Sequence, residues 1–224
     1  MGVSSLAAFG QNAGMGLWRK IFAALYDRMM AEAEKAGLSA HRQALLAGAR
    51  GRVLEIGGGT GANLPFYPDG VTELVIAEPE EPMAIRLERK LQGYRIPTRV
   101  VRAPAEHLPL EPASFDCAVA TLVLCTVTDP DRALAEIRRL LKPGGRLLFL
   151  EHVRSEDPGL ARWQDRLRVP WSWIGCGCQC NRRTVANIHA AGFAVSDLRH
   201  EIFPKAAPLA RPLVIGSATF DHAR

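Results

Sequence analysis

The sequence lacks the features that would direct a chain into a membrane or out of the cell. No apolar run among its 224 residues reaches the roughly 18 that a membrane-spanning helix needs. No charged segment followed by an apolar core marks a secretory signal. We therefore expect a cytoplasmic protein.

Dense basic runs with interleaved aromatic residues are also missing, although the net charge is +5. Arginine is spread along the chain, which indicates a mild bias towards anionic surfaces and no nucleic-acid partner. The length and the 48% hydrophobic content are those of one soluble globular domain. The oligomeric state stays open.

The cysteines favour neither a disulfide framework nor a metal site. Their number is odd, at five, and no export signal accompanies them. Cys176, Cys178 and Cys180 alternate, whereas zinc sites use pairs two or more residues apart and a fourth ligand. We expect no bound metal and predict that Cys178 lines a substrate pocket. Cys125 either lines that pocket or fills the core.

The stretch from Val53 to Asn63, Val-Leu-Glu-Ile-Gly-Gly-Gly-Thr-Gly-Ala-Asn, predicts a cofactor site. Val53 to Ile56 is typical of a buried strand, and a helix can start near Ala62. Between them stand four glycines: Gly57, Gly58, Gly59 and Gly61. Such a turn lets the backbone approach a ligand closely, and its free N–H groups attract negative charge.

Two cofactors fit this turn. Gly57, Gly59 and Ala62 satisfy the dinucleotide fingerprint, and Glu78 follows at the distance expected of a ribose ligand. With Glu55, the same glycines also form acid-x-Gly-x-Gly-x-Gly, which resembles motif I of class I S-adenosylmethionine-dependent methyltransferases. Glu55 favours S-adenosylmethionine, because its carboxylate suits a protonated amino group and would lie close to a pyrophosphate.

Strands and helices alternate from residue 53 to residue 153, which implies a parallel, doubly wound α/β sheet. Strands are predicted at 53–56, 72–77, 98–102, 115–121, 146–153, 193–199 and 212–220. Helices are predicted at 17–36, 39–49, 83–92, 129–141, 159–169 and 182–191. Ligands of such sheets bind beyond the carboxyl ends of the strands. Residues 1–14 are expected to be loose.

The chain from about residue 17 to residue 220 resembles the small type 11 methyltransferases that include the thiol methyltransferases. Three stretches carry the resemblance: Thr121 to Val127, Glu151 to Val153, and Gly177 to Thr184. It implies a Rossmann-like sheet, mostly parallel with an antiparallel last strand, helices on both faces and an extra N-terminal helix. We expect one domain, made of a helical lid or cap (1–48), a cofactor-binding core (49–153), a substrate-loop insertion (154–183) and a C-terminal helix and strand pair (184–224).

The resemblance also implies where the cofactor binds. The family carries an Asp that holds the adenine amino group, and this chain has Pro104 at that position, so Ala105 or Glu106 is expected to replace it. The predicted cofactor-binding residues are Glu55, Gly57, Gly58, Gly59, Gly61, Asn63, Glu78, Pro79, Ala105, Glu106, Thr121 and Leu122.

The segment after the fourth strand, Leu122 to Cys125, is apolar and lacks the Asn or Asp followed by Pro-Pro of enzymes that methylate nitrogen. We therefore expect a small, largely apolar methyl acceptor, with a thiol first and a phenol or quinol hydroxyl next. Carbon methylation of a quinone and nitrogen methylation of a phospholipid headgroup are alternatives. An NAD-dependent oxidoreductase and a non-catalytic cofactor-binding protein are alternatives of another class.

Two side chains are candidates for catalysis. His152, at the end of the fifth strand, could serve as a base for a phenol, or could be a packed histidine without a role. Helix 17–36 is either packed on the domain, a lid that turns Tyr26 or Trp18 towards the methyl group, or a helix in peripheral contact with a membrane. Trp18, Cys125, Trp171 and Cys178 are the predicted substrate-binding residues.

Overall fold

The computed structural model describes residues 6–220, and its side-chain description leaves out 6–16, 18 and 19. The strands are β1 (Gly51–Ile56), β2 (Val71–Ala77), β3 (Thr98–Val101), β4 (Phe115–Thr121), β5 (Leu141–His152), β6 (Ala194–Ile202) and β7 (Pro212–Thr219). The helices are α1 (Leu6–Ala33), α2 (Ser39–Leu46), α3 (Glu81–Lys90), α4 (Pro130–Leu140), α5 (Pro158–Arg166), α6 (Arg168–Ile174) and α7 (Thr184–Ala190). None of the helices described is long and apolar enough to cross a membrane.

The strands form one sheet in the order β3-β2-β1-β4-β5-β7-β6. The first five strands are parallel, and β7 runs antiparallel to both β5 and β6. The prediction of a mostly parallel sheet with an antiparallel last strand is therefore confirmed. The first crossover holds only a short 3-10 turn, Leu64–Phe66, because Pro65 lies within it.

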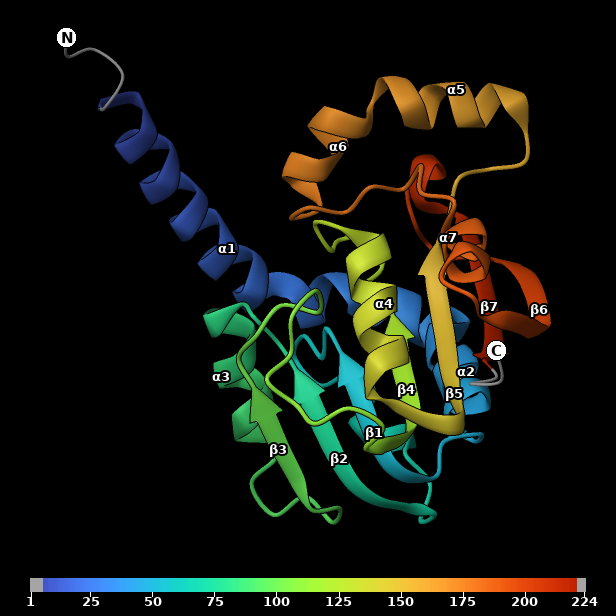
Figure 1. Ribbon diagram of the computed structural model, residues 1–224. Helices are drawn as coiled ribbons and strands as arrows, with labels where there is room; N and C mark the ends of the chain where they lie inside the picture. Colours follow the sequence, from blue (N-terminus) through green and yellow to red (C-terminus); the bar gives the residue numbers. More distant parts are fainter. Residues whose placement is uncertain (1–5, 221–224) are drawn as a thin grey trace, which may run out of the picture.

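Helices cover both faces of the sheet (Figure 1). One apolar cluster joins the strands to α4 and α7, and a second joins the opposite face to α2 and α3. Helix α4 shows how the sequence produces this packing: Ala133, Leu134, Ile137 and Leu140 recur on one side and are fully buried. The Asp129 side chain caps its first turn by accepting from two backbone N–H groups.

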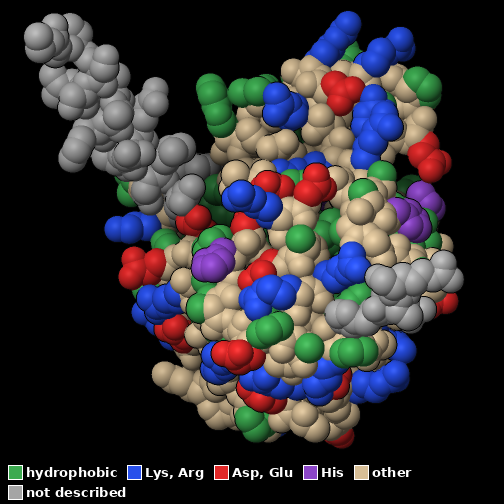
Figure 2. Space-filling model, viewed as in Figure 1, with side chains coloured by type: hydrophobic (Ala, Val, Ile, Leu, Met, Phe, Trp, Pro, Cys, Tyr) green, Lys and Arg blue, Asp and Glu red, His purple; other side chains and the backbone are tan. Residues whose placement is uncertain are grey.

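Three helices lie beyond the carboxyl ends of the parallel strands, namely α1, α5 and α6 (Figure 1). Helix α1 already begins at Leu6, so part of the segment predicted to be loose is helical, in keeping with its alanines. Gly37, with a φ of 131°, breaks the helical path before α2. The predicted helix 159–169 is instead two helices, because α5 ends at Arg166 and Pro170 fits the first turn of α6. Hydrophobic side chains gather at the surface over α6, where Trp173 and Ile174 are exposed (Figure 2).

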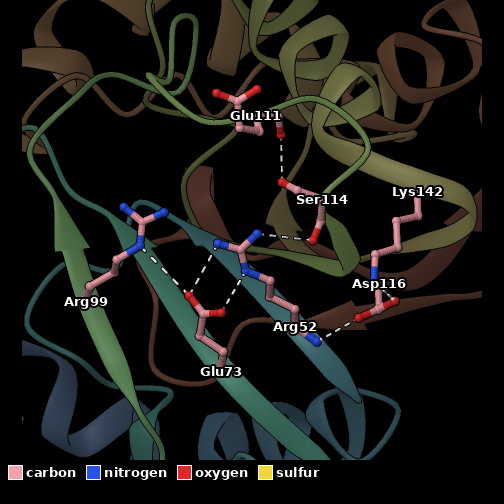
Figure 3. A network of polar contacts seen from close by, with 7 residues as sticks. All are labelled: Arg52, Glu73, Arg99, Glu111, Ser114, Asp116 and Lys142. Carbon is pink, nitrogen blue, oxygen red and sulfur yellow. Dashed lines mark hydrogen bonds and ion pairs between the residues drawn. The ribbon is translucent and has the colours of Figure 1, made fainter.

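A charged network connects the amino ends of four strands (Figure 3). Arg52 in β1 donates from Nε to Glu73 Oε2 in β2 (2.8 Å) and from its backbone N–H to Asp116 Oδ2 in β4 (2.8 Å). Lys142 in β5 completes it, with Nζ 2.7 Å from Asp116 Oδ1. We call Arg52, Glu73, Asp116 and Lys142 the amino-end network. It lies at the amino ends of the strands, and the glycine turn lies at their carboxyl ends.

Candidate active site

The glycine turn after β1 is packed so tightly that side chains are excluded from it. Gly57 has a φ of 62°, and a Cβ there would overlap Val123 Cγ2 and lie 2.7 Å from Val123 Cβ. At Gly58 a Cβ would overlap Ile76 Cγ2. Gly59 has a φ of 55° and open space where its Cβ would be. The backbone at Gly59 is therefore the part of the turn that a ligand can approach.

A buried polar network lies beside this turn. Glu55 Oε1 accepts from Asn63 Nδ2 (2.9 Å), and Glu55 Oε2 accepts from the Tyr67 hydroxyl (2.7 Å). Asn63 Nδ2 also donates to Thr121 Oγ1 (2.9 Å). All four side chains are buried. The structure thus brings together three residues that the sequence predicted, Glu55, Asn63 and Thr121.

Arg42 of α2 completes the network, and the sequence analysis missed it. Its Nη1 donates to Asn63 Oδ1 (2.9 Å) and Thr121 Oγ1 (3.1 Å), and its Nε donates to Glu34 Oε1 (3.0 Å). Only 2% of Arg42 is exposed. The carboxyl-end network, as we call it, consists of Glu34, Arg42, Glu55, Asn63, Tyr67 and Thr121. A signal was present, since residue 42 falls on the apolar stripe of α2 formed by Leu38, Leu45 and Leu46.

Burial dominates the electrostatics of Glu55. It raises the pKa of this carboxyl to about 7, against the opposing effects of the Tyr67 and Asn63 hydrogen bonds and the Arg42 charge. Its pKa therefore lies close to neutral pH, so a positive charge that approached it would favour the ionised form. The position therefore suits a cationic ligand group.

Helix α1 contributes Tyr26 to the pocket beside the glycine turn. Tyr26 lines the same pocket as Arg42 and the glycines, and burial raises the pKa of its hydroxyl. The next residue, Asp27, accepts a short hydrogen bond from the Thr60 hydroxyl in the glycine turn, and its other oxygen lies 2.9 Å from Lys90 Nζ in α3. The cavity enclosed here has a volume of only about 20 Å³. A larger ligand can enter only if some of the lining side chains move.

Glu78 stands at the end of β2, as predicted. Its Oε2 accepts from the Gly59 N–H (2.8 Å) and its Oε1 from the Glu80 N–H (2.9 Å), while burial raises its pKa. Pro79 is exposed next to it. The two candidates for the adenine contact differ, because Ala105 is buried whereas the Glu106 carboxylate accepts from the N–H groups of Thr128 and Asp129 before α4. Glu106 therefore stabilises the turn before α4.

The loop after β4 is held by a second buried carboxylate. Glu151 Oε1 accepts from the N–H groups of Val123 and Leu124 (both 2.9 Å), and Oε2 accepts from that of Cys125 (3.3 Å). Burial raises the pKa of Glu151 to about 7. Leu122 begins the loop with a φ of 57°, a conformation that non-glycine residues adopt only when their surroundings impose it.

The predicted acceptor side lies next to this loop. Cys178 follows α6 and places its Sγ 3.8 Å from Cys125 Sγ. Trp171 of α6 is partly buried and contributes to lowering the pKa of Cys178. The structure therefore brings three of the four predicted substrate-binding residues together. The side chain of the fourth, Trp18, lies outside the described residues.

Burial makes His152 a poor candidate for the catalytic base. Strand residues alternate between faces, so Glu151 points to the loop after β4 and His152 points to the opposite face. There its ring packs against Phe203, with 4.7 Å between ring centroids, and burial lowers its pKa to about 4. It does not line the pocket at the glycine turn. The structure favours the interpretation of His152 as a packed, neutral histidine.

Among the described residues, no group of three or more His, Cys, Asp or Glu side chains is arranged to hold a metal ion. The alternating Cys176, Cys178 and Cys180 form no such group, and Cys178 contacts Cys125 instead.

Comparison with known proteins identifies the family. A profile described as "Methyltransferase domain" matches residues 54–149. Thiol S-methyltransferase TMT1B of Homo sapiens is 36% identical over 179 residues, covering 77% of this chain and 73% of its own length. Thiol S-methyltransferase TMT1A of Homo sapiens is 33% identical over 224 residues, covering 91% and 89%. The chain is a class I S-adenosylmethionine-dependent methyltransferase.

This methyltransferase is also similar to a second group of methyltransferases in sequence and to a solved methyltransferase in structure. The quinone C-methyltransferase UbiE of Haemophilus ducreyi is 39% identical over 105 residues, which is 45% of this chain and 40% of the relative. A solved structure of an S-adenosylmethionine-dependent methyltransferase from Thermotoga maritima, named as a possible histamine N-methyltransferase, superimposes with a TM-score of 0.67. It is 25% identical and covers 89% of this chain and 97% of its own.

The residues of the methyltransferase fit S-adenosylmethionine. The open backbone at Gly59 and the carboxylate of Glu78 suit the ribose. Arg42 and Glu55, two of the three charged residues of the carboxyl-end network, have the signs that match the two charges of an amino acid. Arg42 would face the carboxylate of the cofactor and Glu55 its ammonium group. When bound, the cofactor supplies an electrophilic methyl group on a sulfonium.

Proposed function

We propose that this methyltransferase transfers the methyl group to the sulfur of a small, largely apolar thiol. The observation that carries the proposal is the bonding of the loop after β4. Its backbone N–H groups at Val123, Leu124 and Cys125 are all taken by Glu151, and that of Leu122 by Leu150 O. The segment from Leu122 to Cys125, whose side chains are apolar, therefore offers an acceptor no free backbone N–H donor.

A thiol suits such a surface better than an amine or an alcohol. Amines and hydroxyl groups lose hydrogen bonds to water when they enter an apolar site, whereas a thiol is a weak donor and acceptor. A thiol with a pKa near 8.5 also supplies a few per cent of thiolate at neutral pH without a base. This agrees with the lowered pKa of His152, which makes it a weak base. The similarity to the human thiol S-methyltransferases supports the same choice.

We further propose that α1 acts as the lid of the site. Asp27 attaches this helix to Thr60 and Lys90, and Tyr26 covers the pocket beside the glycine turn. The raised pKa of Tyr26 keeps its hydroxyl protonated at neutral pH, so it can donate a hydrogen bond but cannot act as a base. Its role would be to position the cofactor and exclude water.

A matched series of acceptors tests the proposal. Thiophenol, phenol and aniline share one ring and differ only in the atom that receives the methyl group. With S-adenosylmethionine, we expect thiophenol to give the highest kcat/KM, measured by formation of S-adenosylhomocysteine and by mass of the product. A kcat/KM for phenol or aniline that equals or exceeds that of thiophenol would contradict it.

Carbon methylation of a quinone is the second candidate, because UbiE matches about half of the chain. The same assay with a short-chain benzoquinol distinguishes the two. A product methylated on a ring carbon, with no turnover of thiophenol, would favour this candidate over the thiol.

A further inference from the structure

Cys125 and Cys178 form a thiol pair on the acceptor side. They lie far apart in the sequence, yet their Sγ atoms are 3.8 Å apart and both residues are buried. The sulfurs of a disulfide are about 2.05 Å apart. An approach of about 1.8 Å, which small side-chain rotations can supply, would therefore bond them.

The backbone on both sides keeps the pair in register. The N–H of Gln179 donates to Cys125 O (2.8 Å), and Arg182 Nη1 donates to Leu124 O (2.6 Å). Glu151 holds the N–H of Cys125 from the other side. The backbone contacts therefore hold the two segments together, so the proximity of the two cysteines does not depend on their side-chain rotamers alone.

The two thiols are not equivalent. Cys178 is 9% exposed and Cys125 only 1%. The hydrogen bond within the pair lowers the pKa of Cys178 and raises that of Cys125. Burial raises the pKa of Cys117 to about 12 and that of Cys180 to about 11. Cys178 is therefore the thiol prepared to attack, and Cys125 the thiol placed to follow.

We propose that Cys125 and Cys178 form an oxidisable dithiol site that reacts with low-molecular-weight disulfides and closes to an intramolecular disulfide. In the first step the Cys178 thiolate attacks one sulfur of the reagent, forming a mixed disulfide and releasing one thiolate. In the second, the Cys125 sulfur attacks Cys178 Sγ, breaks the mixed disulfide and releases the second thiolate. The protein sulfurs lose two electrons and the reagent gains them, and the two thiol protons pass to the released thiolates.

The closed form would tie the segment after α6 to the loop after β4. If the acceptor is a thiol, as the proposed function holds, the acceptor itself can reopen the disulfide, and its oxidised form can close it. The site would then respond to the redox state of the acceptor pool. The reaction at the two cysteines does not itself require methyl transfer, so it can be tested independently of the proposed function.

The test uses the full-length protein, reduced, desalted and treated under native conditions with 2-hydroxyethyl disulfide. After denaturation, the free thiols are alkylated and the digested protein is analysed by mass spectrometry without reduction. We expect the number of alkylated cysteines to fall from five by two, a peptide pair joined through Cys125 and Cys178, and full reversal by 2-mercaptoethanol.

Single variants identify the order of the steps. C125S should keep a mercaptoethanol adduct on Cys178, and C178S should take up no reagent at Cys125. C180S is the matched control on the same segment and should close as the unmodified chain does. A cross-link through Cys176 or Cys180, or five cysteines still alkylated after treatment, would overturn the proposal. Should C125S or C178S fail to fold, the peptide map of the unmodified chain decides by itself.

Discussion

The two ends of the sheet carry polar networks of similar composition and opposite burial. In the amino-end network, the side chains of Arg52 and Glu73 are 31% and 37% exposed, and those of Lys142 and Asp116 are 43% and 36% exposed. In the carboxyl-end network, Arg42 and Glu55 are 2% and 1% exposed. Water still solvates the first set of charges, whereas the second depends almost entirely on its protein partners.

This difference separates a structural role from a functional one. Partly exposed ion pairs contribute little to stability, and replacing one of them disturbs little. Buried charges cost free energy on folding unless every partner is in place, so a chain selected only for stability would do better with apolar residues there. Arg42 and Glu55 would supply both signs of charge to a zwitterionic cofactor group, and we attribute their burial to that proposed role.

The largest effect is expected from removing the buried cation. Arg42→Met removes the donor to Asn63 Oδ1 and one of the two donors to each of Glu34 and Thr121. It should lower the free energy of unfolding by about 3–5 kcal/mol. The matched change at the other end, Arg52→Met, should cost about 1 kcal/mol or less. Urea unfolding measures both. Similar losses for the two variants would remove the distinction between the networks.

The two networks should also respond to pH with opposite sign. Glu55 has a folded-state pKa of about 7, above its unfolded value, so its contribution to stability is complete in acid and is lost as the pH rises through 7. The loss can reach about 3 kcal/mol between pH 4.5 and 7.5. The folded-state pKa of Asp116 is lowered by Lys142 and Arg52, so its contribution is present at neutral pH and is lost as the pH falls below 4.

Difference measurements isolate these effects from other titrating groups. His152, whose pKa is lowered to about 4, makes the fold more stable as the pH rises to about 6.5, and this opposes the trend from Glu55. Unfolding free energies of the unmodified chain and of Glu55→Gln, subtracted at each pH, cancel the His152 contribution. A difference that does not change between pH 4.5 and 7.5 would show that Glu55 is ionised throughout.

The next smaller effect on stability is expected from replacing a glycine by alanine at each end of β1. A Cβ at Gly57 would overlap Val123, a buried β-branched side chain with little freedom, so Gly57→Ala should cost about 2–4 kcal/mol. A Cβ at Gly51 would overlap the Asp116 carboxylate, which can rotate towards water, so Gly51→Ala should cost about 1–2 kcal/mol. Thermal unfolding ranks the two. An equal or larger loss for Gly51→Ala would contradict this account.

The smallest effect on stability is expected at the lid. Asp27→Asn weakens the bridge from α1 to Lys90, and should change the free energy of unfolding by less than about 1 kcal/mol because both side chains are partly exposed. It should nevertheless speed dissociation of S-adenosylhomocysteine, measured by stopped-flow fluorescence. An unchanged dissociation rate would show that α1 does not close over the cofactor.

The sequence was most informative where backbone geometry decides the outcome. The four glycines, the acid before them and the alternation of strands and helices predict the sheet and the position of the cofactor site, because few other residues satisfy such a turn. Pro65 likewise predicts the shortened crossover. These features depend on local chain geometry, which neighbouring residues determine.

Side-chain partners were harder to predict, because they depend on register and tertiary contact. Glu151 and His152 are adjacent and must face opposite ways, but nothing in the sequence says which of them holds the loop after β4. Arg42 was overlooked because an arginine in an amphipathic helix is usually assigned to the solvent side. The contact of Cys125 with Cys178 joins two segments whose meeting only the three-dimensional structure reveals.

The attachment of α1 to the glycine turn also bears on the pace of the reaction. Asp27 and Tyr26 are neighbours on one helix, so the contact that anchors the helix and the side chain that covers the pocket move together. With α1 as the proposed lid, spent cofactor would leave only when the whole helix moves. We expect the enzyme to bind the cofactor before the acceptor and to release the demethylated cofactor last. The rate at which α1 opens would then limit kcat.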